Sequence, residues 1–271
     1  MNKIQEEVKA SERYNLECEE LSNGIQLVKL TKDNVAKVES IIRTDSNYSS
    51  FKEANYDNDK YSPYWIREMG KHLGQITDEK IKEPDFKTIV ENVVEKIDKE
   101  NGTHLKATFD DERTTAVHVM KRRIIEIKDT LLNYLKDPNY KNGDKTLIDI
   151  LSEQTKLKNN GTRRHLSFAS KFCHYSCYHL FSGEKEQDNY SIYDRYVREA
   201  LPLYLEKYNI PNNTKINNKI SYKEYQEAID KILEKADEKI SRNGFDHLVW
   251  YYFKGDRIKN EKNSNKKGEG K

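Results

Sequence analysis

The chain has 271 residues, 35% of them charged, and its mean hydropathy of −1.01 argues against an integral membrane protein. With only 5 prolines and 11 glycines, its composition favours helices over a β-sandwich or a β-barrel. We therefore expect an all-α fold in two helical lobes. The first twenty residues lack the apolar core of a secretory signal, and the 3 cysteines cannot pair completely, so we expect a cytoplasmic protein with reduced thiols.

The N-terminal part is predicted to hold two helices separated by a polar segment. Thr31 is placed to cap a helix over residues 32–43, in which apolar residues recur at helical spacing. Residues 44–64 are polar and rich in turn formers, which indicates a long loop or a linker. A second helix is expected over 85–102, because its apolar pattern ends at Asn-Gly, as helices commonly do.

The longest helix of the chain is predicted over residues 110–137, where Pro138 ends it. Asp144 is placed to cap the next helix, over 145–157. An Asn-Gly turn follows at 158–162. This order predicts a helix that leads directly into a tight, basic turn.

A second, apolar helix is expected after that turn, over residues 167–183, with Ser167 as its N-cap. Between residues 154 and 183 the chain has no Asp or Glu, although it holds 46 of them in total. The segment carries five basic residues, Lys156, Lys158, Arg163, Arg164 and Lys171. Its polar part is expected to attract anions, whereas burial of the apolar helix would by itself explain the missing acids there.

The C-terminal part is predicted to contain three more helices. One starts near Ser191 or Asp194 and runs to residue 208, a plain amphipathic helix spans 221–241, and an aromatic-rich one spans 245–256. We divide the chain into an N-terminal, mostly helical region of unknown function (1–110), a region that contains the basic turn and the helices around it (111–254) and a disordered, weakly basic tail (255–271).

The stretch "LSFASKF" and the later "YSIYD", whose aspartate lies 23 residues after the lysine, carry a family resemblance. Together they resemble the helix-hairpin-helix DNA glycosylases, especially the 8-oxoguanine DNA glycosylase branch. The resemblance implies that Lys171 is the nucleophile and Asp194 its carboxylate partner. The glycines of the family's hairpin are absent here, with Phe168 and Ser170 near their positions. The four cysteines of an iron–sulfur cluster are absent as well, so no cofactor or metal is expected.

The implied reaction explains why these residue types are needed. A neutral lysine amine attacks C1′ of the deoxyribose and forms a Schiff base, and a carboxylate stabilises the positive charge that builds on the sugar. Burial of Lys171 and nearby cations would favour its neutral form. Two simpler roles stay open: Lys171 as a surface lysine at a helix edge, and Asp194 as a helix N-cap alone.

The implied partner is double-stranded DNA that carries a damaged or modified base, which must leave the stack to react. The resemblance and the local charge give four candidate phosphate contacts, Lys158, Arg163, Arg164 and His165. Flipped bases stack on aromatic walls. The candidate wall residues are Phe168, Tyr175, Tyr193 and Trp250, with Phe245 and Tyr251 as further aromatic candidates.

Three alternatives compete with this hypothesis. The pattern "RTTAVH" resembles the active-site motif of HEPN ribonucleases, with Arg113 and His118 in the catalytic positions. A helix-hairpin-helix unit also binds phosphates without chemistry, which would make the chain a DNA-binding module. Cys173 and Cys177 share a helix face, but a second ligand pair at zinc-site spacing is missing, so buried free thiols are expected instead.

Overall fold

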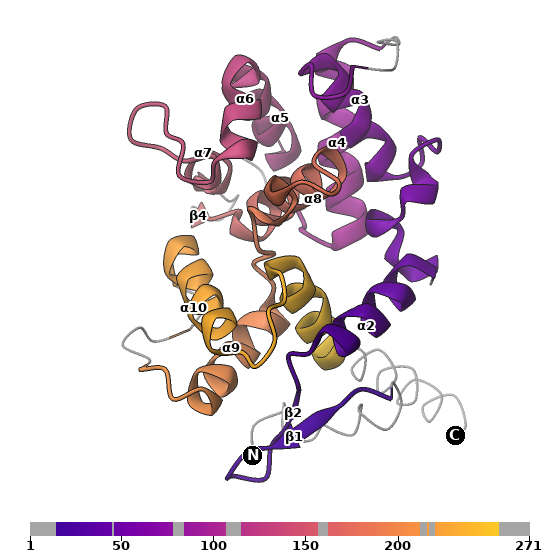
Figure 1. Cartoon of the computed structure of the whole chain (residues 1–271). Coiled ribbons are helices and arrows are strands. Elements are labelled where there is room, and N and C mark those ends of the chain that lie inside the picture. Colours follow the sequence, from indigo (N-terminus) through magenta and orange to yellow (C-terminus); the bar gives the residue numbers. More distant parts are fainter. Residues whose placement is uncertain are drawn as a thin grey trace, which may run out of the picture. The chain divides into compact units, whose positions relative to one another are not determined.

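The computed structural model describes residues 15–44, 46–77, 84–106, 115–156, 162–211, 216 and 220–254. These residues are mostly helical, which confirms the expected all-α class (Figure 1). The chain divides into two compact units: unit 1 comprises Met1–Ile41 and Tyr193–Lys271, and unit 2 comprises Ile42–Ile192. These two units differ from the three regions predicted from the sequence, 1–110, 111–254 and 255–271. The predicted regions were defined by expected function and stay predictions. The tail 255–271 lies outside the described residues.

Unit 1 joins the two ends of the chain. Its elements are β1 (Cys18–Glu20), β2 (Gln26–Val28), α2 (Lys32–Thr44, up to Ile41), α9 (Arg195–Lys207), α10 (Tyr222–Lys235) and the helical residues 242–254. β1 and β2 pair antiparallel, with Cys18 opposite Val28. The sequence did not predict this hairpin, because three-residue strands are too short to show a clear alternation. Thr31 begins α2 as predicted, since its side chain accepts a hydrogen bond from the Asn34 N–H at 3.2 Å.

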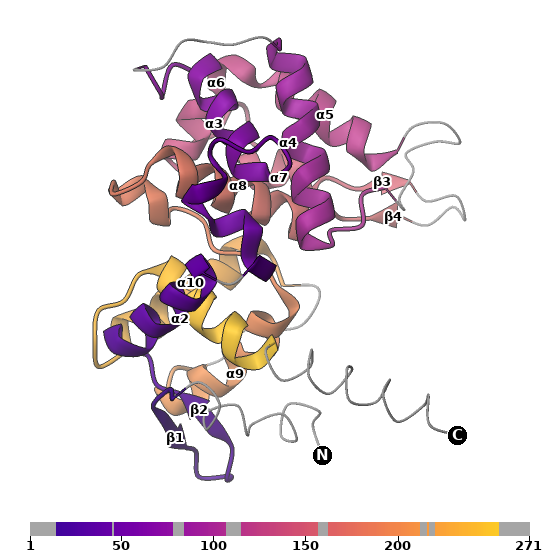
Figure 2. The same ribbon diagram turned by 90° about the vertical axis from the view of Figure 1, so that its right-hand side faces the viewer.

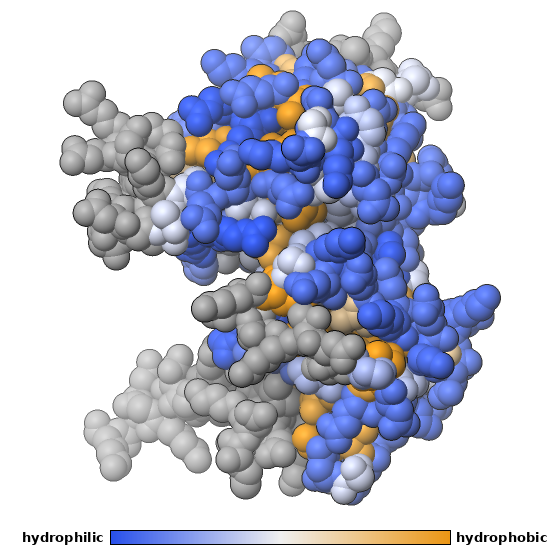
Figure 3. Space-filling model, turned by 90° about the vertical axis from the view of Figure 1, so that its left-hand side faces the viewer, coloured by the Kyte–Doolittle hydropathy of each residue, from blue (hydrophilic) through white to orange (hydrophobic). Residues whose placement is uncertain are grey.

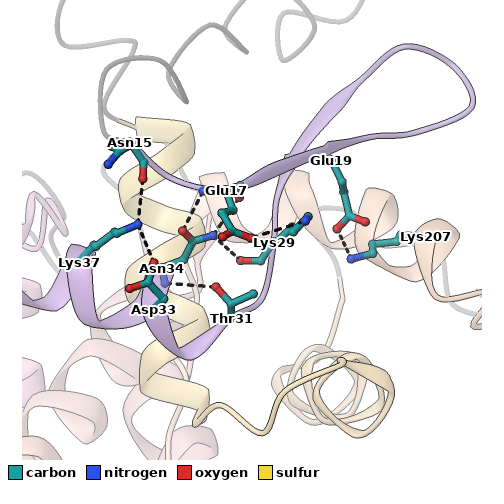
Figure 4. A network of polar contacts seen from close by, with 9 residues as sticks. All are labelled: Asn15, Glu17, Glu19, Lys29, Thr31, Asp33, Asn34, Lys37 and Lys207. Carbon is teal, nitrogen blue, oxygen red and sulfur yellow. Dashed lines mark hydrogen bonds and ion pairs between the residues drawn. The ribbon is translucent and has the colours of Figure 1, made fainter.

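Asn34 connects the hairpin to α2 through a buried set of hydrogen bonds (Figure 4). Its side-chain oxygen accepts from the Glu17 N–H at 2.9 Å, and its amide nitrogen donates to the carbonyls of Glu17 and Lys29, both at 2.9 Å. The side chain is fully buried, so water cannot replace these partners if they are lost. A salt bridge between Lys207 of α9 and Glu19 of β1 fixes the other side of the hairpin.

We expect Asn34→Ala to lower the free energy of unfolding by about 2–4 kcal/mol, because it leaves buried backbone groups of the hairpin without partners. Urea denaturation measures this change. Asn92→Ala is the matched control, since among the described residues the Asn92 amide bonds only an exposed helical carbonyl, that of Thr88, at 2.9 Å. Equal losses in the two variants would show that the Asn34 contacts do not hold the hairpin.

Unit 2 is built around one buried helix, α8 (Leu166–Leu180), of which every residue except Ser167 is buried. Figure 1 and Figure 2 both show α8 among the other helices of this unit. These are η2 (Ser46–Phe51), η3 (Glu53–Asn55), α3 (Ser62–His72), α4 (Phe86–Asn101), α5 (Ala116–Glu126), α6 (Lys128–Lys136), α7 (Leu147–Ser152) and η4 (Lys185–Asp188). A second hairpin, β3 (Thr155–Lys156) with β4 (Thr162–Arg163), joins α7 to α8.

Helix α4 begins and ends where the sequence predicted. The Asp85 side chain accepts a hydrogen bond from the Thr88 N–H at 2.8 Å, and Gly102 adopts the left-handed conformation (φ 57°) that ends the helix. After it, the Asp98 carboxylate accepts from the Leu105 N–H at 2.8 Å and from the Thr103 hydroxyl. The turn that follows α4 at Gly102 is therefore held by the side chains of Asp98 before it and Thr103 after it.

Several expectations for unit 2 are wrong. The helix expected over 110–137 is two helices, because the chain breaks at Ile127 (φ −103°, ψ 15°), and its first residues, 110–114, lie outside the described residues. The segment expected as a loop over 44–64 contains η2, η3 and the start of α3. The cap of α7 is Thr146 rather than Asp144, since Thr146 and Asp149 form a reciprocal capping box.

The surface drawn in Figure 3 is mostly hydrophilic, with smaller hydrophobic areas, as the mean hydropathy of −1.01 leads one to expect. Within the ranges that the structure describes, no helix has the length and apolar character needed to cross a membrane.

Candidate active site around Lys171

A short β-hairpin leads into the helix that carries Lys171. In it Thr155 pairs with Arg163 and Lys156 with Thr162. The chain then enters α8 at His165, which is the N-cap residue in place of the predicted Ser167. The His165 N–H donates to the Ser152 carbonyl at 3.3 Å, so the end of α7 is joined to the start of α8. In chain order, α7, the β3–β4 hairpin and α8 thus follow one another, and their role as a helix-hairpin-helix element stays a prediction.

Lys171 is buried in unit 2, with 8% of the residue exposed, and so it is not a surface lysine. Its amine donates a hydrogen bond to the backbone carbonyl of Asn101 at 3.0 Å. Asn101 is the last residue of α4, where carbonyls lack partners inside the helix and attract cations. One turn further along α8, the Tyr175 hydroxyl donates to the side-chain oxygen of the same Asn101 at 2.7 Å.

Aromatic residues occupy the same face of α8 as Lys171. His174, Tyr175 and Tyr178 follow it at helical spacing, and Phe51 of η2 packs edge-on against all three. The ring centroid of Phe51 lies 5.2 Å from that of Tyr175 and 5.9 Å from that of Tyr178. Phe51 lies in the segment 44–64, whose polar composition indicated a loop, so the sequence did not predict this contact. Edge-to-face contacts at this separation are a favoured packing of buried aromatic rings.

Asp194 begins α9 in unit 1, which confirms its prediction as an N-cap. One carboxylate oxygen accepts a hydrogen bond from the Tyr196 N–H at 2.7 Å. The other oxygen has no hydrogen bond to a described residue, and the side chain is partly exposed. Asp194 and Lys171 belong to different units, so their pairing in one cleft stays a prediction.

The segment that follows α8 is anchored to unit 2 at Tyr190. The hydroxyl of Tyr190 donates to the Tyr134 carbonyl at 2.6 Å, and its own carbonyl lies 2.9 Å from Nδ1 of His174. Since a carbonyl only accepts, Nδ1 of His174 carries the hydrogen in this contact. The chain that continues to Asp194 is thus attached to α8 one turn beyond Lys171.

The basic residues at the end of the hairpin, Arg163, Arg164 and His165, differ from one another in exposure and in their contacts. Arg164 is exposed and lies 3.4 Å from the Ser152 hydroxyl, whereas Arg163 is partly buried and its guanidinium lies 3.4 Å from the Thr103 carbonyl. His165 is buried, and Nε2 contacts the Thr155 hydroxyl at 2.7 Å. Burial, with smaller effects of Arg163 and Arg123, lowers the pKa of His165 to about 4, so this side chain is neutral at pH 7. Lys158 lies outside the described residues.

The aromatic residues predicted to line a base pocket lie in both units. In unit 2, Tyr175 shares the contact to Asn101 with Lys171, and Phe168 stacks on Phe172 inside the core. In unit 1, Tyr193 packs against Tyr225 with ring centroids 5.0 Å apart, and the Lys254 amine lies 4.1 Å from the ring centroid of Trp250. Phe245 and Tyr251 are buried in unit 1. Only Tyr175 is brought next to a contact of Lys171 by the described structure.

The ribonuclease motif is described only in part, so that alternative stays open, whereas both cysteines of the other motif are described. His118 is exposed at the start of α5, 2.9 Å from the Thr115 hydroxyl, while Arg113 lies outside the described residues. Cys173 and Cys177 are free and buried, and burial raises the pKa of both thiols well above their ordinary value. Among the residues that the structure describes, no group of three or more His, Cys, Asp or Glu side chains is arranged to hold a metal ion.

His179, near the end of α8, links the site to η2 and gives the protein a pH-dependent stability. Its Nε2 lies 2.7 Å from the Ser50 carbonyl and must donate to it, so Nδ1 accepts from the Tyr56 hydroxyl at 3.1 Å. Burial, with a smaller effect of Arg67, lowers the pKa of His179 from 6.5 to about 4. The neutral ring is therefore the form that fits this site.

The contribution of the neutral His179 ring to the stability of the fold is complete above pH 6.5. It is lost as the pH falls towards 4, because His179 takes up a proton in the unfolded chain at a higher pH than in the folded chain. We expect about 2–3 kcal/mol of stability to be lost through His179 between pH 7 and pH 4.5. Urea denaturation at the two pH values measures the loss, and His179→Gln should reduce it by that amount. An identical loss in the variant would show that His179 does not titrate in this way.

No family model matches the chain, and no curated protein or solved structure matches it either. Its function must therefore be inferred from the residues of the site.

Proposed function

We propose that the chain is a DNA glycosylase that excises a damaged or modified base through the amine of Lys171. The observation that carries the proposal is the buried amine of Lys171, which lies in the helix that follows a hairpin with basic residues. Lysines are rarely buried without a specific reason, and a Schiff-base nucleophile is one. The match of Lys171 and Asp194 to the spacing in helix-hairpin-helix glycosylases gives the reaction class.

The proposed reaction begins with attack of the neutral amine on C1′ of the target nucleotide. The bond between C1′ and the lysine nitrogen forms while the N-glycosidic bond breaks, and the base leaves with the bonding electrons. Loss of the proton from nitrogen and opening of the sugar ring give the Schiff base. Water then hydrolyses it, or elimination of the 3′ phosphate cleaves the strand.

Asp194 is proposed to stabilise the positive charge on the sugar with the carboxylate oxygen that does not cap α9. Arg164, whose side chain is exposed, and Arg163 are proposed to contact phosphates on either side of the target nucleotide. His165 is neutral at pH 7 and buried, so it adds no charge to this contact. Of the aromatic residues predicted to line the base pocket, Tyr175 is proposed to lie near the Lys171 amine, because both side chains bond Asn101.

Borohydride trapping tests the proposal. Purified protein is mixed with duplexes that carry 8-oxoguanine, an abasic site or no lesion, and the Schiff base is reduced to a stable adduct. An adduct on a lesion-bearing duplex but not on the plain duplex is the expected result. If no duplex gives an adduct, binding of the duplexes would indicate a DNA-binding module. Cleavage of RNA by the same preparation would instead favour the ribonuclease with Arg113 and His118.

A further inference from the structure

Asn101 makes four hydrogen bonds at the point where α4 meets α8. Its carbonyl accepts from the Lys171 amine at 3.0 Å, and its side-chain oxygen accepts from the Tyr175 hydroxyl at 2.7 Å. Its amide nitrogen donates to the Ile97 carbonyl at 3.1 Å and to the Ser50 hydroxyl at 3.2 Å. One residue thus contacts both the proposed nucleophile and the tyrosine one turn along the same helix.

The backbone around Asn101 is fixed as well. The next residue, Gly102, ends α4 in the left-handed conformation (φ 57°), which glycine adopts without strain. The Asp98 carboxylate holds the following turn through the Leu105 N–H at 2.8 Å. With two donations from its amide nitrogen, the Asn101 side chain has its oxygen directed at Tyr175. Both acceptors that Asn101 offers to α8 are therefore held in place.

We propose that Asn101 is a positioning residue that sets the direction and the charge state of the Lys171 amine. The inference rests on the proposed function, because a position matters to catalysis only if the amine is the nucleophile. Asn101 places two oxygen acceptors beside α8, its backbone carbonyl for Lys171 and its side-chain oxygen for Tyr175, without adding a negative charge there. An aspartate would offer the same acceptor to Tyr175 but would favour the ammonium form of Lys171, which cannot attack.

Asn101→Asp is the sharpest test, because the side chain keeps its shape and its acceptor for Tyr175 and gains a negative charge. It also loses the donations to the Ile97 carbonyl and the Ser50 hydroxyl, and the Asn92→Asp control likewise loses its donation to the Thr88 carbonyl. The rate of adduct formation is measured against pH with the full-length protein and an abasic-site duplex. We expect the midpoint of the profile to move to higher pH by about one unit, and the rate below the midpoint to fall about 10-fold. The neighbouring titratable residues Glu100 and His174 are unchanged in the variant, so the shift reports the new carboxylate.

Asn92→Asp is the matched control. It introduces the same charge on the same helix, nine residues earlier, where the Asn92 amide bonds only the exposed carbonyl of Thr88. A midpoint that stays at the wild-type value in Asn101→Asp, or an equal shift in Asn92→Asp, would overturn the inference. A shift in Asn101→Asp alone would support it.

Tyr175→Phe is a second variant that does not depend on charge. It removes the hydroxyl that contacts Asn101 and keeps the ring that packs against Phe51. We expect adduct formation at saturating duplex to slow about 10-fold, with the dissociation constant for the duplex unchanged within about 2-fold. Tyr140→Phe, in the loop after α6, is the control and should leave both values unchanged. Equal rates in Tyr175→Phe and wild type would contradict a positioning role for this contact.

Chemical labelling separates failure of this inference from failure of the proposed function. Acetylation of Lys171 by acetic anhydride, followed by mass spectrometry at a series of pH values, reports the neutral amine without DNA. If the wild type forms no adduct on any duplex, the proposed function fails. A labelling midpoint that is higher in Asn101→Asp would still support the role of Asn101, and an unchanged midpoint would overturn it.

Discussion

Lys171→Gln is expected to abolish the borohydride adduct, with a loss of about 1000-fold or more, because glutamine has no nucleophilic amine. The substitution is expected to preserve the fold, because glutamine is neutral, similar in size and has an N–H donor for the Asn101 carbonyl that the lysine contacts at 3.0 Å. Adduct yield on an abasic-site duplex, measured on a denaturing gel, gives the result. Binding of the same duplex should change little, because the amine is not a proposed phosphate contact.

Lys185→Gln is the control for this experiment. The Lys185 side chain is 90% exposed in η4 of the same unit, and its only described contact is an ion pair with Glu186 at 3.8 Å. This variant should give the same yield of borohydride-trapped adduct as the wild type. If Lys171→Gln also gives the wild-type yield of adduct, another amine forms the Schiff base, and the assignment of Lys171 as the nucleophile is wrong.

Lys71→Met is expected to lower the free energy of unfolding by about 3–5 kcal/mol, the largest effect on stability that we predict. Lys71 and Glu68 form an ion pair of 2.7 Å on α3 in which both side chains are only 3% exposed. The second carboxylate oxygen of Glu68 has no hydrogen bond to a described residue. Removing the lysine would leave this carboxylate charged and buried. Burial and the charge of Glu68 raise the pKa of Tyr64, and the effect of Glu68 on Tyr64 would grow without the lysine.

The double variant Glu68→Met/Lys71→Met should recover most of this loss, because two buried apolar side chains need no charged partners. Urea denaturation of the wild type, both single variants and the double variant gives the coupling energy. Lys223→Ala removes an exposed pair with Glu227 on α10, 3.8 Å apart, and should cost less than about 0.5 kcal/mol. Equal costs for the buried and the exposed lysine would show that the Glu68 pair is solvated.

Local patterns in the sequence predicted the parts of the fold that depend on local contacts. Asp85 and Gly102 mark the two ends of α4, and Asp194 begins α9, because caps act within one turn of the chain. The break at Ile127 was not predicted, since the apolar pattern continues through it and only packing in the folded unit separates α5 from α6.

The candidate site depends on contacts that no local pattern contains. Lys171 and Tyr175 were predicted from the family resemblance and from their residue types. Their partner Asn101 lies 70 positions before Lys171 and appeared in the sequence only as part of an Asn-Gly helix end. Phe51 was missed for the same reason, because it reaches α8 from a segment whose polar composition indicated a loop. In unit 1, the buried Asn34 resembles any helix-surface asparagine until the hairpin is folded against it.

Mapping the trapped adduct to a residue tests the central claim most directly. The wild-type protein is reduced on an abasic-site duplex, the adduct is digested with protease and nuclease, and the peptide that carries the sugar remnant is sequenced by mass spectrometry. We predict that the remnant lies on the side-chain nitrogen of Lys171. A remnant on another lysine or on the N-terminal amine, or no adduct with a folded protein, would contradict the proposed role of Lys171.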